Sequence, residues 1–101
     1  MNTDTYVSLI KDIEASMKEY EKIIGVSAIA TRQMFDRYGC KETLEKLVLT
    51  SDQQSGFKRL VKAGKSELTF EAIVIRHKYL FSRDVVDAAR WQLKQVKVKI
   101  D

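Results

Sequence analysis

The sequence predicts an all-α fold, a compact bundle of five or six short helices in a single domain. The chain has no proline and only four glycines among 101 residues, and these are the residue types that most strongly interrupt helices. Along most of the chain, apolar residues recur at spacings of three and four, as they do on one face of a helix. The only segment that alternates as a strand would is Val96, Val98 and Ile100, at the C-terminal end.

Length and composition indicate one globular domain over residues 1–101. Hydrophobic residues make up 45% of the chain and charged residues 32%, so a chain of this size can bury roughly two thirds of the surface of its unfolded form. We divide the domain into N-terminal helices at 1–49, a polar connector at 50–56 and C-terminal helices at 57–96. The connector has no apolar periodicity, so we expect it to be the most mobile internal segment.

Nothing in the sequence indicates a membrane or secreted protein. Uncharged apolar stretches are far shorter than the roughly 20 residues that span a bilayer. The first residues lack the basic start and apolar core of a signal peptide. The single cysteine, Cys40, cannot form an internal disulfide, which suits a reducing compartment. We therefore expect a cytoplasmic location and no membrane contact.

The first helix is the most clearly periodic element. Thr3 or Asp4 can cap its start, and Gly25 can end it. Glu14 and Lys18 stand four residues apart, which predicts an ion pair on the outer face. Alternating steps of four and three predict the buried stripe: Tyr6, Ile10, Ile13, Met17, Tyr20 and Ile24.

Two short helices follow and meet near Gly39. The second is expected to run from Ser27, as its N-cap, to Tyr38, and the third from Glu42 to Leu49. The predicted buried residues are Ala30, Met34 and Tyr38 in the second helix and Leu44, Leu47 and Val48 in the third.

Two short helices joined by a turn also suit a DNA-binding helix-turn-helix. However, the exposed side of the third helix carries Glu42 and Glu45 beside Lys41 and Lys46. Glutamates are rare on a helix that faces phosphates, so a plain αα-hairpin is the favoured interpretation.

The C-terminal half holds the expected core. An amphipathic helix begins near Phe57 and ends at Ala63 and Gly64. Phe70 to Ile75 is the densest apolar run; its β-branched residues allow a buried strand, but no partner strand is evident, so we predict a helix. The expected core residues are Phe57, Leu60, Phe70, Ile73, Val74, Leu80, Phe81, Val86 and Leu93.

The last helix is expected from Arg83 to about Val96, with Ser82 as its cap and Asp84 in its first turn. Its buried stripe consists of Val85, Val86, Ala89, Leu93 and Val96. Trp91, the only tryptophan, falls nearly opposite this stripe and must point away from it.

Several of these positions resemble a small helical domain that recurs in uncharacterised bacterial proteins. The similarity covers roughly residues 38–93. The matching positions are Tyr38, Gly39, Glu42, Ser55 to Phe57, Leu60, Gly64, Lys65, Leu68, Thr69, Glu71 to Ile75, Leu80, Phe81, Ala89, Arg90 and Leu93. Members often have Arg in place of Lys65, and Pro where this chain has His77 and Lys78. The resemblance implies a bacterial or phage origin and carries no known activity.

Residues that could support chemistry are few. His77 is the only histidine and Cys40 the only cysteine, so no zinc site can be completed. A nucleophilic pair of Cys40 and His77 is formally possible, but a small residue at a helix junction is the favoured interpretation of Cys40. No glycine-rich phosphate loop is present. We therefore predict no enzyme, no catalytic residue, no metal and no cofactor.

Charge is distributed unevenly along the chain. Residues 1–55 carry 7 basic and 9 acidic residues, and residues 56–101 carry 11 and 5, so the halves have net charges of −2 and +6. Two basic stripes follow in the second half: Lys58, Lys62 and Lys65, and then Arg83, Arg90, Lys94 and Lys97. If the two helices pack side by side, the stripes would merge into one nucleic-acid-binding surface. A solvated basic face is the plainer interpretation.

The favoured function is a small non-catalytic protein-interaction or regulatory module; a nucleic-acid-binding module is the alternative. The first rests on Trp91 with the nearby Ala88, because exposed tryptophan is enriched where binding energy concentrates. Three coverings for Trp91 remain open: Tyr6 or Tyr20 of the same domain, a second copy of the chain, or another protein.

Overall fold

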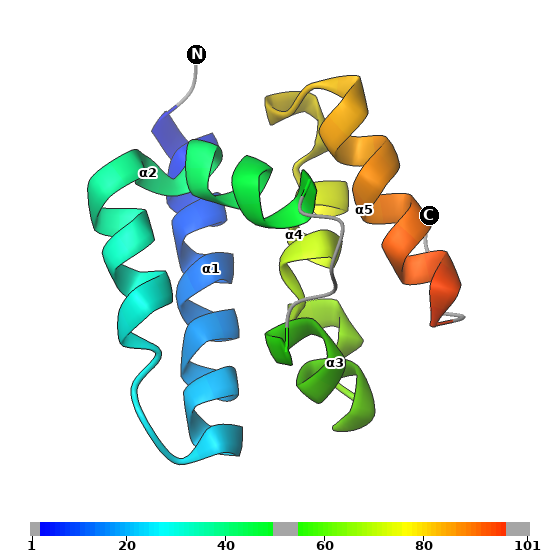
Figure 1. Cartoon of the computed structure of the whole chain (residues 1–101). Helices are drawn as coiled ribbons and strands as arrows, with labels where there is room; N and C mark the ends of the chain where they lie inside the picture. Colours follow the sequence, from blue (N-terminus) through cyan, green and yellow to red (C-terminus); the bar gives the residue numbers. More distant parts are fainter. Residues whose placement is uncertain (1–2, 50–54, 97–101) are drawn as a thin grey trace.

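The computed structural model describes residues 3–49 and 55–96, and over these residues the chain is a helical bundle without strands (Figure 1). The predicted all-α fold is confirmed. Residues 50–54 of the predicted connector lie outside the described part, and so do the alternating residues Val98 and Ile100. The elements are α1 (Thr3–Ile24), α2 (Ile29–Leu49), α3 (Ser55–Lys62), the 3-10 turn η1 (Ser66–Leu68), α4 (Phe70–Arg76), the 3-10 turn η2 (Lys78–Leu80) and α5 (Arg83–Gln95).

The short helix α4 is the element that the others cover. It packs against α5, α1 and α2, and the side chains of Ile73 and Val74 are fully buried. The hydroxyl of Thr69 accepts a hydrogen bond from the backbone N–H of Ala72 (3.1 Å) and donates one to the carbonyl of Ser66 (2.8 Å). This cap fixes the start of a helix. The helical interpretation of residues 70–75 is therefore confirmed, β-branched residues notwithstanding.

One apolar cluster joins α1, α2, α4 and α5. Of the nine predicted core residues, seven are buried, and Phe70 and Leu80 are half-buried and pack against the cluster. Phe70 also meets Phe35 of α2 edge to face, with ring centroids 5.7 Å apart. The cluster consists of Leu9, Ile13, Met17, Leu44, Val48, Ile73, Val74, Phe81, Val85, Val86 and Ala89.

The buried stripe of α1 differs from the predicted one. Ile13 and Met17 are buried as expected, but Ile10 is 51% exposed, and Leu9 and Ser16 are buried instead. The other predicted members, Tyr6, Tyr20 and Ile24, are half-buried. Leu9 and Ile10 are about 100° apart on the helix. Apolar spacing allowed either residue, and the packing of α1 against α4 selects Leu9.

A carboxylate, Glu21, fixes the turn between α1 and α2. Gly25 ends α1 with a positive φ of 78°, as predicted. The Glu21 carboxylate accepts hydrogen bonds from the Ala28 N–H (2.7 Å) and from Arg32 Nε (2.8 Å) and NH2 (2.7 Å). Arg32 and this N–H hold the pKa of Glu21 at about 2. Ser27 was expected to cap α2; the side-chain hydrogen bond found at this turn runs instead from the Ala28 N–H to Glu21. Glu14 pairs with Arg32 (3.4 Å) rather than with Lys18.

Gly39 bends α2 and divides it into two helical halves. This agrees with the prediction that a helix ends at this glycine. Its φ of 84° is accessible mainly to glycine, and the hydroxyl of Thr43 donates to the carbonyl of Met34 across the bend (2.9 Å). The second half therefore starts directly after Gly39 rather than at Glu42. It buries Leu44 and Val48, with Leu47 half-buried.

The predicted face of the first half of α2 is wrong. Ala30 and Tyr38 are exposed and Met34 is half-buried. Phe35, one position along the helix, turns inward toward Phe70 instead. This half runs beside α1 at the edge of the bundle (Figure 1), and much of its surface is exposed.

The C-terminal helices match their expected bounds closely. The chain turns after α3 at Gly64, with a φ of 76°. Ser82 occupies the N-cap position of α5 without a side-chain capping hydrogen bond, and Val96 is half-buried rather than buried. Gln92 is buried instead, because its amide Nε2 donates to the Val48 carbonyl of α2 (3.5 Å).

Leu93→Ala should lower the free energy of unfolding by about 2 to 5 kcal/mol, because the Leu93 side chain is fully buried. Chemical denaturation of the two proteins measures this difference. Leu49→Ala is the matched control, since Leu49 is 53% exposed and its loss should cost about 0.5 kcal/mol or less. Equal stability of the Leu93 variant and the parent would remove this face of α5 from the core.

Candidate functional site

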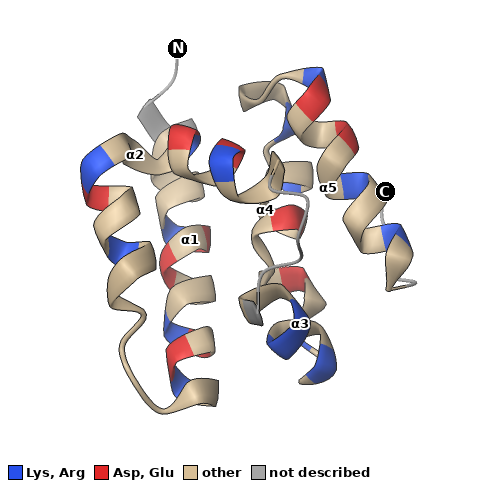
Figure 2. Ribbon diagram, in the orientation of Figure 1, with Lys and Arg blue, Asp and Glu red and all other residues tan. Residues whose placement is uncertain are grey.

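The two basic stripes lie on helices whose main contacts are with different elements. α3 packs mainly against α1 and η1, whereas α5 packs mainly against α4 and α2. Figure 2 shows the basic segments of α3 and of α5 at separate places. Lys97 lies outside the described residues, Arg90 is half-buried, and Arg83 pairs with Asp87 (3.9 Å). The remaining members, Lys58, Lys62, Lys65 and Lys94, are exposed. The side-by-side packing that the merged surface requires is therefore not found among the main helix contacts.

Trp91 lies on the outer side of α5. Its side chain is 58% exposed, while Ala89 and Leu93, on the opposite side, are fully buried. The alternative in which Tyr6 or Tyr20 covers Trp91 within the domain is therefore wrong. Ala88, three residues earlier, is half-buried and packs against the apolar cluster, so only part of it is accessible beside Trp91.

A hydrogen bond joins α5 to α2 one residue away from Trp91. Gln92 of α5 bonds the Val48 carbonyl of α2. Trp91 and Leu49 are the chain neighbours of these two residues, and Leu49 is 53% exposed. We call Trp91 and Ala88 the α5 surface. Charged side chains of α5, among them Asp87 and Lys94, are exposed around Trp91.

His77 is not paired with Cys40. Its Nε2 lies 2.8 Å from Oδ2 of Asp12 in α1, and its side chain is buried. Arg76 contacts the same oxygen of Asp12 through Nε (3.4 Å) and donates to the Glu67 carbonyl (2.7 Å). Burial raises the pKa of the Cys40 thiol, which lowers its reactivity. Within 3–49 and 55–96, no group of three or more His, Cys, Asp or Glu residues could hold a metal ion.

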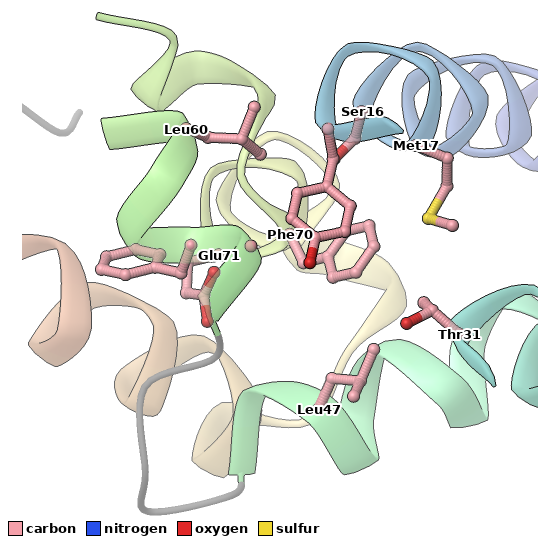
Figure 3. A pocket seen from close by; sticks show the side chains of 10 residues that line it. Ser16, Met17, Thr31, Leu47, Leu60, Phe70 and Glu71 are labelled. Carbon is pink, nitrogen blue, oxygen red and sulfur yellow. The ribbon is translucent and has the colours of Figure 1, made fainter. Parts of the chain in front are cut away.

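A small cavity lies between α1, α2, α3 and α4, and Figure 3 shows the side chains around it. Its volume is about 80 Å³. Apolar side chains from all four helices form most of its wall, together with the hydroxyl-bearing residues of α1 and α2 and one carboxylate from α4. We call it the Glu71 cavity. It is lined by Ser16, Met17, Tyr20, Thr31, Leu47, Gly56, Phe57, Leu60, Phe70 and Glu71.

The Glu71 side chain is an unusual component of this wall because it is only 2% exposed. Burial raises its pKa to about 7, against an ordinary value of 4.5, although its own backbone N–H offsets part of the effect. A carboxyl group in this environment changes its charge near neutral pH. Glutamate is almost never fully buried without a partner.

Glu71 had no predicted role, although its spacing from Val74 indicates that it faces the interior. Glu71 stands three residues before Val74, and residues three apart share one face of a helix. Val74 was expected in the core and is fully buried. The acidic residue in the densest apolar segment therefore had to enter the interior with it.

Comparisons of the chain with protein-family models, with curated proteins and with solved structures gave no match. Among the described helices, none has both the length and the apolar character needed to cross a membrane.

Replacing Glu71 with Gln should flatten the dependence of stability on pH between about 4.5 and 7. The folded pKa of Glu71 lies above its unfolded value, so ionisation favours unfolding. Its cost is absent below pH 4.5 and fully present above pH 7, where it reaches about 3 kcal/mol. Denaturation of both proteins across this range gives the difference directly.

The exposed residue Glu67 supplies the control, because Glu67→Gln removes a negative charge from the surface instead of from the interior. Glu21, whose pKa is lowered, acts in the opposite direction: its contribution to stability is lost as the pH falls from 4.5 toward 2. If the profiles of the Glu71→Gln variant and the parent are parallel from pH 4.5 to 7, the Glu71 carboxyl is not buried.

Proposed function

We propose that this chain is a non-catalytic protein-interaction or regulatory module of a bacterium or phage, acting in the cytoplasm through the α5 surface. One observation carries the proposal: the only tryptophan of the chain is 58% exposed. Contact with water is unfavourable for so large an aromatic side chain, and tryptophan is among the residues most enriched at binding hot spots.

The position of Trp91 supports this function. The opposite side of α5 is fixed in the core through Ala89 and Leu93, so binding at Trp91 would order few additional groups and cost little entropy. The exposed charges around it resemble the polar rim of an interface. The partner is either a second copy of the chain or another protein.

Trp91→Ala should weaken association by about tenfold or more, because hot-spot residues carry most of the binding energy. Self-association is measured first, by sedimentation of the parent protein over a range of concentrations; if the parent is monomeric, the same variants are compared against partners captured from the native organism. The emission of Trp91 should shift to shorter wavelength only in the complex.

Tyr79 provides a matched control, since it is an aromatic residue 72% exposed on η2. Tyr79→Ala should leave association unchanged. If the parent binds neither itself nor any captured protein, or if the Trp91 variant binds as well as the parent, the α5 surface is not an interface.

Nucleic-acid binding is a second candidate function. The exposed cations of α3 favour a site on this helix alone, which is smaller than the merged surface expected from the sequence. Lys58, Arg59, Lys62 and the following Lys65 are all exposed around this one helix. These four cations could contact phosphates without any contribution from α5.

The parent protein should then bind duplex DNA at low salt, with an affinity that falls about 100-fold between 50 and 200 mM salt if four phosphates are contacted. Changing both Lys58 and Lys62 to Glu should abolish this binding, whereas changing Arg90 and Lys94 to Glu should reduce it little. No retention of the parent on DNA or RNA at low salt would exclude this candidate.

A further inference from the structure

We propose that the Glu71 cavity binds a small primary alkylammonium group, with the Glu71 carboxylate as its counter-ion. This site is separate from the α5 surface, and it does not depend on the function proposed above. The inference rests on what lines the cavity, on the charge of that lining and on the volume enclosed.

The negative charge of the lining favours a positively charged ligand. Among the described residues that line the cavity, Glu71 is the only charged one. No ion pair identified between described residues involves it, and its side chain is 2% exposed. A buried carboxylate without a counter-ion is unfavourable, so the group either remains protonated or acquires a positive partner. An anion would be repelled.

The chemistry of the walls selects an organic ammonium over a metal ion. Calcium needs six to eight oxygen ligands, and magnesium needs six, whereas the cavity offers a single carboxylate. Met17, Leu47, Phe57, Leu60 and Phe70 provide apolar contact for a short alkyl chain. An ammonium group has three N–H donors, and the hydroxyl oxygens of Ser16 and Thr31, which also line the cavity, can accept hydrogen bonds in addition to the carboxylate.

The volume limits the ligand to a few atoms. A cavity of about 150 Å³ holds benzene, with its six heavy atoms, so 80 Å³ suits about three. Ethylammonium has three heavy atoms. Because ligands of this size gain at most about 1.5 kcal/mol per heavy atom, the dissociation constant should be about millimolar or weaker.

The experiment is an NMR titration of the full chain with ethylammonium chloride, compared with ethanol of equal size and with sodium chloride. It is performed at about pH 8.5, where Glu71 is ionised and the amine remains protonated. The titratable residues of the lining are Glu71 and Tyr20. We expect saturable shifts at the amides of the lining residues, with ethylammonium binding at least about tenfold more tightly than ethanol.

Two variants test the role of the carboxylate. Glu71→Gln keeps the shape of the side chain and removes its charge, and it should weaken ethylammonium binding by about tenfold or more. Glu67→Gln removes an exposed charge outside the cavity and should change nothing. Equal binding of ethylammonium and ethanol by the parent protein, or equal binding by the Glu71→Gln variant and the parent, overturns the proposal. The first comparison needs no variant, so it holds even if Glu71→Gln fails to fold.

The ammonium group could come from a free small amine or from a lysine side chain of another protein. A blocked lysine, acetylated at its α-amino group and amidated at its carboxyl, distinguishes these sources in the same titration. Tighter binding than ethylammonium assigns the site to a protein lysine, and weaker binding assigns it to a free amine. Either result supports the ammonium site, whereas saturable binding of neither compound overturns it.

Discussion

The structure depends on the burial of α4. This helix has only seven residues, too few to be stable alone, and its Ile73 and Val74 are completely removed from water. Each such side chain contributes about 1.5 to 3 kcal/mol when it is fully buried. That stabilisation is available only if neighbouring elements surround α4, and α1, α2 and α5 do so. The bend of α2 at Gly39 serves this purpose, since the second half of α2 supplies the buried Leu44 and Val48.

The burial of α4 also determines where the polar groups lie. Glu71 is carried inside because it shares a face with Val74, and His77, at the end of the same helix, is buried against Asp12 of α1. On the far side, α5 places Ala89 and Leu93 in the core, which leaves Trp91 outside. The α5 surface and the Glu71 cavity, the two features to which binding is attributed, are therefore both consequences of covering one short apolar helix.

Helix ends and buried residues were predictable wherever the sequence pattern allowed only one arrangement. Gly25, Gly39 and Gly64 each adopt a positive φ where a helix was expected to end or turn, and Ile73, Val74 and Leu93 are buried as their density and spacing indicated. Where two faces of one helix were both apolar, the spacing of apolar residues did not determine which face is buried. Ile10 was preferred to Leu9, and Ala30 and Tyr38 to Phe35, because the choice is made by contacts between helices distant in sequence.

Among the candidate sites, too, features of a single helix were predictable from the sequence, and features that depend on contacts between helices were not. The periodicity of α5 predicted that Trp91 points away from the buried stripe, but it left open whether Tyr6 or Tyr20 covers it, and the structure shows Trp91 exposed. The merged basic surface required α3 and α5 to be neighbours, which the sequence does not encode locally, and α3 packs on α1 instead. The Glu71 cavity is formed by residues of four helices, so the sequence could not predict it. The three-residue spacing of Glu71 and Val74 indicates only that the Glu71 side chain points inward.

The most direct test of the burial of α4 is the titration of Glu71 itself, followed by NMR of its side-chain carboxyl carbon, Cδ, in the folded protein. A midpoint near pH 7 is expected, because the carboxyl group is covered by the helices that surround α4. A midpoint near the ordinary value of 4.5 would place the carboxylate in water. It would contradict both the packing around α4 and the ammonium site built on it.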